Sequence, residues 1–122
     1  MNLRVHLAEH GADAERLDQV TGYLRQDLLQ LDVRAVTALR AGPPPEGSRA
    51  LDVATVGGLL VTLGQSTTAL QTIVTAIRSW LQRGTPVQRA VRVEIDGDVL
   101  ELADASSEDQ DRLVALFVGR HT

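Results

Sequence analysis

The chain has 122 residues, the length of one domain with a single hydrophobic core. Its net charge of −4 and its single tryptophan, tyrosine and phenylalanine argue against a nucleic-acid binder, which would need a basic patch or a stacking surface. The absence of cysteine excludes disulfides, thiol nucleophiles and cysteine-ligated metals. Because the first ten residues lack the apolar core of a signal peptide, we expect a cytoplasmic protein with one domain over residues 1–122.

Residues 2–8 alternate between apolar and polar side chains, which predicts a half-buried strand. Asp13 can cap the helix that follows through its side-chain oxygen. One face of that helix carries apolar residues three or four positions apart, namely Leu17, Val20, Leu24, Leu28 and Leu31. Residues 32–39 return to strand character. A strand, a helix and a strand in succession predict a parallel pair joined by a right-handed crossover.

The proline-rich segment AGPPPEGS (41–48) predicts a semi-rigid connector. After it, no charged residue occurs between Asp52 and Arg78. Such a stretch is a core, an interface or a membrane element, and core and interface remain equally open because both bury the same side chains. Its serine, threonine and glutamine residues are unfavourable in lipid, so a simple membrane span is not favoured.

We predict two helices in this central stretch. Residues 53–63 are almost wholly apolar and predict the first helix, in spite of a glycine pair that costs helix stability. Gly64 would cap or kink it. Ser66 or Thr67 would cap the second helix, and Gly84 with a following proline would stop it.

The second helix has two different sides. The stripe of Leu70, Ile73, Val74, Ile77 and Leu81 has helical spacing and is predicted to face the sheet. The other flank carries uncharged polar residues, where a helix that meets only water usually carries charges. We predict that this flank forms an interface, with Trp80 at its boundary as an anchor. The predicted interface residues are Thr68, Gln71, Thr75, Trp80 and Gln82.

Residues 88–95 alternate again, and Asp96-Gly97 is a strong hairpin signal. A loop of these two residues pairs Arg92 with Glu101, whereas a loop shifted by one residue sets Glu94 against Glu101. We predict the first register because opposed like charges destabilise a strand pair.

Ser106 or Ser107 would cap a last helix, with Gln110 completing a capping box. Its predicted buried stripe is Leu113, Leu116 and Phe117. The element order is therefore strand, helix, strand, two helices, hairpin and helix. That order predicts an α+β fold with a mixed four-stranded sheet and helices over at least one face.

No motif in the sequence indicates catalysis. It contains neither a phosphate-binding loop nor a nucleophile elbow, and no local spacing supports a Ser, His and Asp set. His6 and His10 are four residues apart, but the first lies in a strand, so they do not predict a metal site. We therefore predict no catalytic residue, no cofactor and no metal, and a protein that is not an enzyme.

The chain resembles the effector-associated constant component family of small bacterial proteins. The resembling parts are LRVHL, the leucine-rich helix with DVRAVTAL, AGPPPEG followed by ALDVATVGG, ALQTIVTAIRSWLQRG, and VRVEIDGDVLELADAS. The resemblance implies a small α+β protein, found mainly in actinobacteria and encoded beside variable effectors. It brings no defined active-site residues.

This resemblance implies a role in bacterial conflict systems, including antiphage defence. The expected partner is an effector such as a trypsin-like or caspase-like protease, and the expected function is that of an adaptor that also forms a homo-oligomer. An alternative is a membrane-acting protein whose central helices insert when triggered. A ligand-binding module or an enzyme with a dispersed site is a third reading, because fold alone does not decide function.

Overall fold

The computed structural model describes residues 2–31, 33–42, 56–64, 67–81, 89–103 and 108–121. Eight elements follow in order: β1 (Asn2–Glu9), α1 (Ala14–Leu29), β2 (Ala35–Gly42), β3 (Val56–Thr62), α2 (Thr67–Leu81), β4 (Arg89–Ile95), β5 (Asp98–Ala103) and α3 (Glu108–Gly119). The predicted α+β class is confirmed. Of the predicted connector over 41–48, Ala41 and Gly42 belong to β2; the rest of it, and the predicted caps at 106 and 107, lie outside the described residues.

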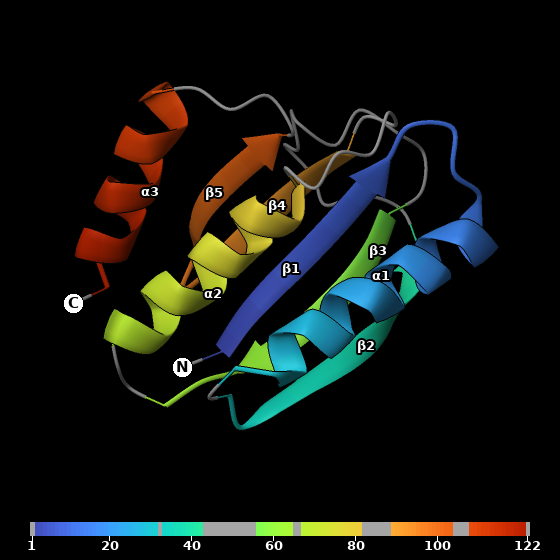
Figure 1. Cartoon of the computed structure of the whole chain (residues 1–122), viewed down its shortest axis with the longest axis horizontal. Helices are drawn as coiled ribbons and strands as arrows, with labels where there is room; N and C mark the ends of the chain where they lie inside the picture. The colour runs from blue at the N-terminus through green and yellow to red at the C-terminus, as the bar shows by residue number, and fades with distance from the viewer. Residues whose placement is uncertain are drawn as a thin grey trace.

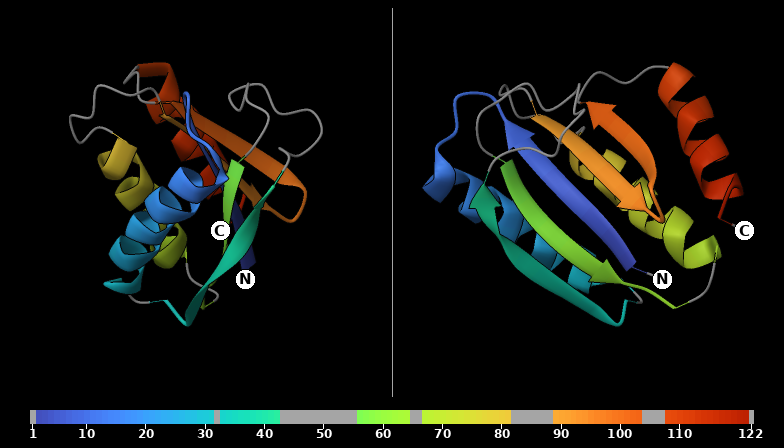
Figure 2. Two further views of the ribbon diagram at one scale, coloured as in Figure 1. Left: turned by 90° about the vertical axis from the view of Figure 1, so that its right-hand side faces the viewer. Right: turned by 180° about the vertical axis from the view of Figure 1, so that it is seen from behind.

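The strands form one antiparallel sheet in the order β2-β3-β1-β4-β5. Helices α1 and α2 lie side by side over one face, and α3 lies beside β5 at the edge of the sheet (Figure 1). Seen from behind, the other face carries none of the described helices (Figure 2). The sheet thus has five strands instead of the predicted four, and it is antiparallel rather than mixed.

Both differences come from β3, which occupies the region where we predicted the first central helix. A short apolar run fits a buried strand as well as a helix, and β3 takes up seven residues of the run 53–63, with β-branched side chains at Val56, Val61 and Thr62. β3 lies between β2 and β1 and is antiparallel to both. β1 and β2 therefore point the same way, as a crossover requires, but they are not paired as predicted.

The first six elements follow the β-α-β-β-α-β order of the ferredoxin-like, split βαβ arrangement. In this arrangement each helix crosses over the strand that lies between the two strands it connects: α1 passes over β3, which fills the gap between β1 and β2, and α2 passes over β1. The hairpin strand β5 and helix α3 extend the sheet beyond β4. This arrangement carries many unrelated functions, so it does not by itself indicate one.

Local signals for α1 and the hairpin are confirmed. Asp13 caps α1, since its Oδ1 accepts a hydrogen bond of 2.8 Å from the Arg16 backbone N–H. In the hairpin, Arg92 pairs with Glu101 as predicted. The turn places Asp96 and Gly97 at φ 50° and 81°, the left-handed region that the Asp-Gly pair favours.

Helix α1 packs closely on β3 because Gly57 has no side chain. Gly57 is buried under Thr21, and a Cβ added there would collide with the Thr21 hydroxyl and lie 3.3 Å from the backbone oxygen of Leu17. The Thr21 hydroxyl has no hydrogen-bond partner among the described residues. The contact is therefore steric: the hydroxyl fills space above the strand.

Helix α3 buries a different set of residues from the one predicted. Phe117 is fully buried as predicted, together with Val118, and Val114 packs against the core. Leu113 and Leu116 are 49% and 62% exposed, so their predicted burial is wrong. The sequence from 113 to 118 is almost wholly apolar, and a helix at the edge of a sheet buries one side only.

The contact between Gly57 and Thr21 predicts how substitutions will couple. We expect Gly57→Ala to lower the free energy of unfolding by about 1–3 kcal/mol, because it overpacks the interface between α1 and β3. Thr21→Ala alone should cost less, and in combination it should recover much of the loss. Chemical denaturation of the single and double variants measures this coupling.

Gly22→Ala is the matched control, since a Cβ at Gly22 meets nothing within 4 Å and the residue lies in α1. It should stabilise the protein by about 0.5–1 kcal/mol, because alanine loses less conformational freedom in a helix. Equal effects of Gly57→Ala and Gly22→Ala would contradict this explanation of the close packing.

Candidate functional site

Helix α2 separates a buried side from an exposed side as predicted. The predicted stripe of Leu70, Ile73, Val74, Ile77 and Leu81 is buried in the core. The exposed positions of α2 are occupied by threonine, glutamine and serine. We call these residues the Thr/Gln face: Thr68, Gln71, Thr72, Thr75 and Ser79.

Three of the five predicted interface residues lie together on this face, namely Thr68, Gln71 and Thr75. Trp80 does not: it is only 5% exposed and belongs to the core. The guanidinium carbon of Arg89 lies 4.6 Å from the centroid of its ring, a cation–π contact. Gln82 lies outside the described residues.

Two adjoining hollows run along the Thr/Gln face, with volumes of about 400 and 410 Å³. Leu31, Thr68 and Thr72 line both. The first hollow also has Arg34, Gly64, Ala69 and Ile73, and the second has Gln71, Thr75 and Ala76. We call the two hollows together the groove.

The groove is suited to contact rather than to chemistry. Its described lining is aliphatic or uncharged apart from Arg34, and it contains no histidine or carboxylate that could act as a base. The Thr72 hydroxyl donates a hydrogen bond of 2.8 Å to the Thr68 carbonyl oxygen, so its proton is already engaged. A partner that covers the uncharged part of this lining does not have to remove water from a charged group.

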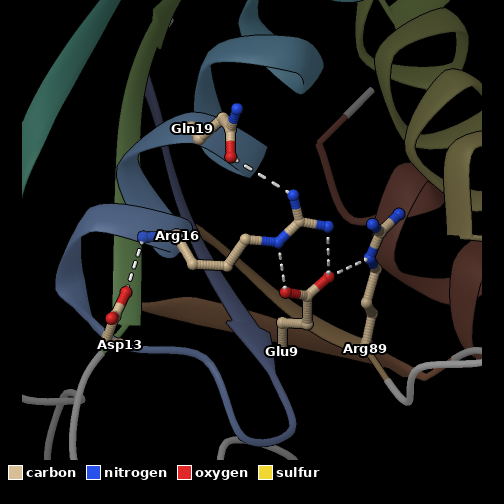
Figure 3. Close-up of polar contacts among 5 residues, drawn as sticks. All are labelled: Glu9, Asp13, Arg16, Gln19 and Arg89. Carbon is tan, nitrogen blue, oxygen red and sulfur yellow. Dashed lines mark hydrogen bonds and ion pairs between the residues drawn. The ribbon is translucent and has the colours of Figure 1, made fainter.

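A second polar arrangement surrounds Glu9 at the end of β1 (Figure 3). Glu9 is 4% exposed. Arg16 of α1 donates to its Oε2 from Nε at 2.9 Å, and Arg89 of β4 donates to its Oε1 from Nε at 3.0 Å. Arg16 also donates from Nη1 to the Gln19 side-chain oxygen at 3.3 Å. One carboxylate therefore joins β1, α1 and β4.

The electrostatics of this cluster keep Glu9 ionised. Burial alone would raise the pKa of Glu9, but the hydrogen bonds and charges of Arg16 and Arg89 outweigh it and leave the pKa below its ordinary value. A carboxylate held in this way stays ionised near neutral pH. We therefore assign the Glu9 cluster a structural role. Local sequence carries no signal for it, because Glu9 and Arg89 are 80 positions apart.

The two histidines considered in the sequence lie apart. His10 is exposed in the turn after β1, whereas His6 lies within β1 between Gly58 of β3 and Arg92 of β4. Burial lowers the pKa of His6, and Arg92 and Arg4 add to this effect against the opposing influence of Glu94. Among the described residues, no group of three or more metal-binding side chains occurs.

Comparison with protein-family models, with curated proteins and with solved structures found no match to this chain.

The Glu9 cluster predicts a specific dependence of stability on pH. Because its pKa is lower in the folded protein, Glu9 stabilises the fold above the pKa of an unfolded glutamate, about 4.3, and this stabilisation is lost as pH falls through the folded pKa. We expect Glu9→Gln to lower the free energy of unfolding by about 2 kcal/mol at pH 7. The variant should lose less further stability in acid than the parent.

Denaturation at pH 7 and at several pH values below 5 measures both effects. Arg16→Gln is the control, since the Arg16 side chain is 42% exposed and its pairing should contribute only about 0–1 kcal/mol. A Glu9→Gln variant as stable as the parent at pH 7 would show that the cluster does not hold β1, α1 and β4 together.

Proposed function

We propose that this protein is a non-enzymatic adaptor that associates with itself and with an effector through the Thr/Gln face of α2. The observation that carries the proposal is that none of the five exposed residues of this face is charged, the half-buried Arg78 being the one charged residue of α2, and that the face borders the groove. Exposed helix faces normally carry lysine, arginine or glutamate, which keep a surface hydrated. A surface of hydroxyl, amide and methyl groups is easier to desolvate in a contact.

The class of partner comes from the sequence resemblance. The effector-associated constant component family implies an effector encoded nearby, such as a trypsin-like or caspase-like protease of a bacterial conflict system. We propose that the protein acts in the cytoplasm beside such an effector. The groove supports this role in general terms, because it offers aliphatic walls and polar rim groups to a protein partner.

The structure gives the membrane alternative no comparable support. That alternative needs two central helices that insert together, and the first of them is strand β3, hydrogen-bonded on both sides. Within the described ranges, no helix combines the length and the apolar character needed to cross a bilayer.

The test places charge on the Thr/Gln face. Gln71→Glu with Thr75→Lys adds an ion pair four residues apart, which a helix accommodates and which leaves the net charge unchanged. Both positions are exposed, so the fold should persist. We expect the variant to lose association with itself, measured by light scattering, and with the co-expressed neighbouring effector, measured by pulldown.

Ala14→Glu with Asp18→Lys is the control, because it creates the same pair on exposed positions of α1, with a change in net charge of +1. These positions lie in the first turns of α1, at the end far from the start of α2 (Figure 1). The control should associate as the parent does. If the α2 variant folds and both of its associations equal those of the parent, the Thr/Gln face is not the interface.

A further inference from the structure

Two leucines on α3 are exposed and do not contribute to the buried core. Leu113 and Leu116 are one turn apart and are about half or more exposed. The same helix already buries Phe117 and Val118 in its own core. The outward side of α3 therefore presents two aliphatic side chains without a described partner in the chain.

The two hollows of the groove follow each other along α2 at a spacing similar to that of the two leucines. The first hollow is lined from α2 by residues 68, 69, 72 and 73, and the second by residues 68, 71, 72, 75 and 76. Thr68 lines both hollows, and the other four residues of the second set are the first set shifted by three residues, which is a rise of about 4.5 Å along a helix. Leu113 and Leu116 are also three residues apart on α3, so the two leucines and the two hollows share one spacing.

We propose that α3 of a second copy of this chain packs along the groove, with Leu113 in the first hollow and Leu116 in the second. Each leucine would then act as a knob in a hole formed by four or five residues of α2, as in helix packing generally. Leu31, which lines both hollows, supplies the aliphatic wall opposite α2. Within one chain the two surfaces do not meet, because the other side of α3 packs on the core.

Charge favours this direction of packing over the reverse. Arg34 is the charged residue in the described lining, and it belongs to the first hollow. The sequence of α3 begins EDQD, three acidic residues that precede Leu113. With Leu113 in the first hollow, this acidic end of the helix is directed toward Arg34. Arg112 also precedes Leu113, but the acidic residues outnumber it.

The contact joins different surfaces on the two copies, so it is heterologous. Each copy that offers its α3 still has an open groove, and each copy that offers its groove still has a free α3. Such contacts build a ring where the rotation closes and an open chain where it does not. This inference rests on the proposed function for its use of the Thr/Gln face and names the occupant of the groove.

Two variants that each remove one surface test the proposal. Thr72→Arg fills both hollows, since Thr72 lines each of them, and Leu113→Glu with Leu116→Lys removes the two knobs without a change in net charge. All three positions are exposed, so folding should persist and circular dichroism checks it. The measurement is sedimentation velocity over a range of protein concentrations.

We expect the parent to associate beyond the dimer or into a ring, and each variant alone to remain a 13.2 kDa monomer. An equal mixture of the two variants should form a one-to-one dimer and nothing larger, because it contains one intact groove and one intact α3. Tyr23→Glu removes an exposed aromatic residue outside both surfaces and should associate like the parent.

The other outcomes overturn the inference. A parent that stays monomeric, or a mixture that forms no dimer, shows that α3 does not occupy the groove. If the leucine variant associates like the parent while Thr72→Arg does not, the Thr/Gln face still forms the interface and only its occupant is wrong. If Thr72→Arg associates like the parent, self-association through the Thr/Gln face fails together with this inference.

Discussion

The absence of a side chain at Gly57 is the constraint on which the helix layer depends. Helix α1 connects β1 to β2 and has to pass over β3, the strand between them. Thr21 occupies the space that a Cβ of Gly57 would fill. A helix displaced from this position would lose its leucine contacts with the sheet, because protein interiors are close-packed. It would also carry Arg16, in its first turns, away from Glu9.

Patterns within a single element were sufficient to predict most of the fold. The alternation in β1 and β4, the cap at Asp13 and the Asp-Gly hairpin are local signals, and each agrees with the structure. β3 could not be predicted in the same way, because the apolar run 53–63 satisfies a strand and a helix equally. The order of the strands depends on which distant segment enters between β1 and β2. Leu113 and Leu116 were misassigned because α3 has more apolar positions than one side can bury.

In the candidate site, too, the features that belong to one helix could be predicted, whereas those that depend on packing between helices could not. The spacing of Thr68, Gln71 and Thr75 is a property of one helix and could be predicted from the sequence. The groove beside them could not, because Leu31 and Arg34 are brought to α2 only by the packing of α1. Charged side chains are paired elsewhere: Glu9 binds Arg16 and Arg89, and Asp98 contacts Arg120 and His121 at the end of α3. These pairs connect α1 and the end of α3 to the sheet. The Thr/Gln face of α2 takes no part in them.

The central position of β1 has a consequence for the way the chain acquires its structure. β1 is the first strand to leave the ribosome, yet its neighbours are β3 and β4, and Leu7 finds its partners at Gly57 and Val91. One of its hydrogen-bonding edges therefore stays open until β3 has been synthesised, and the other until β4 has been synthesised. Folds dominated by such distant pairings close slowly, and unpaired apolar strands aggregate in the meantime. The alternating Arg4 and His6 keep one side of this unpaired strand polar, and polar side chains of this kind protect an exposed strand against aggregation.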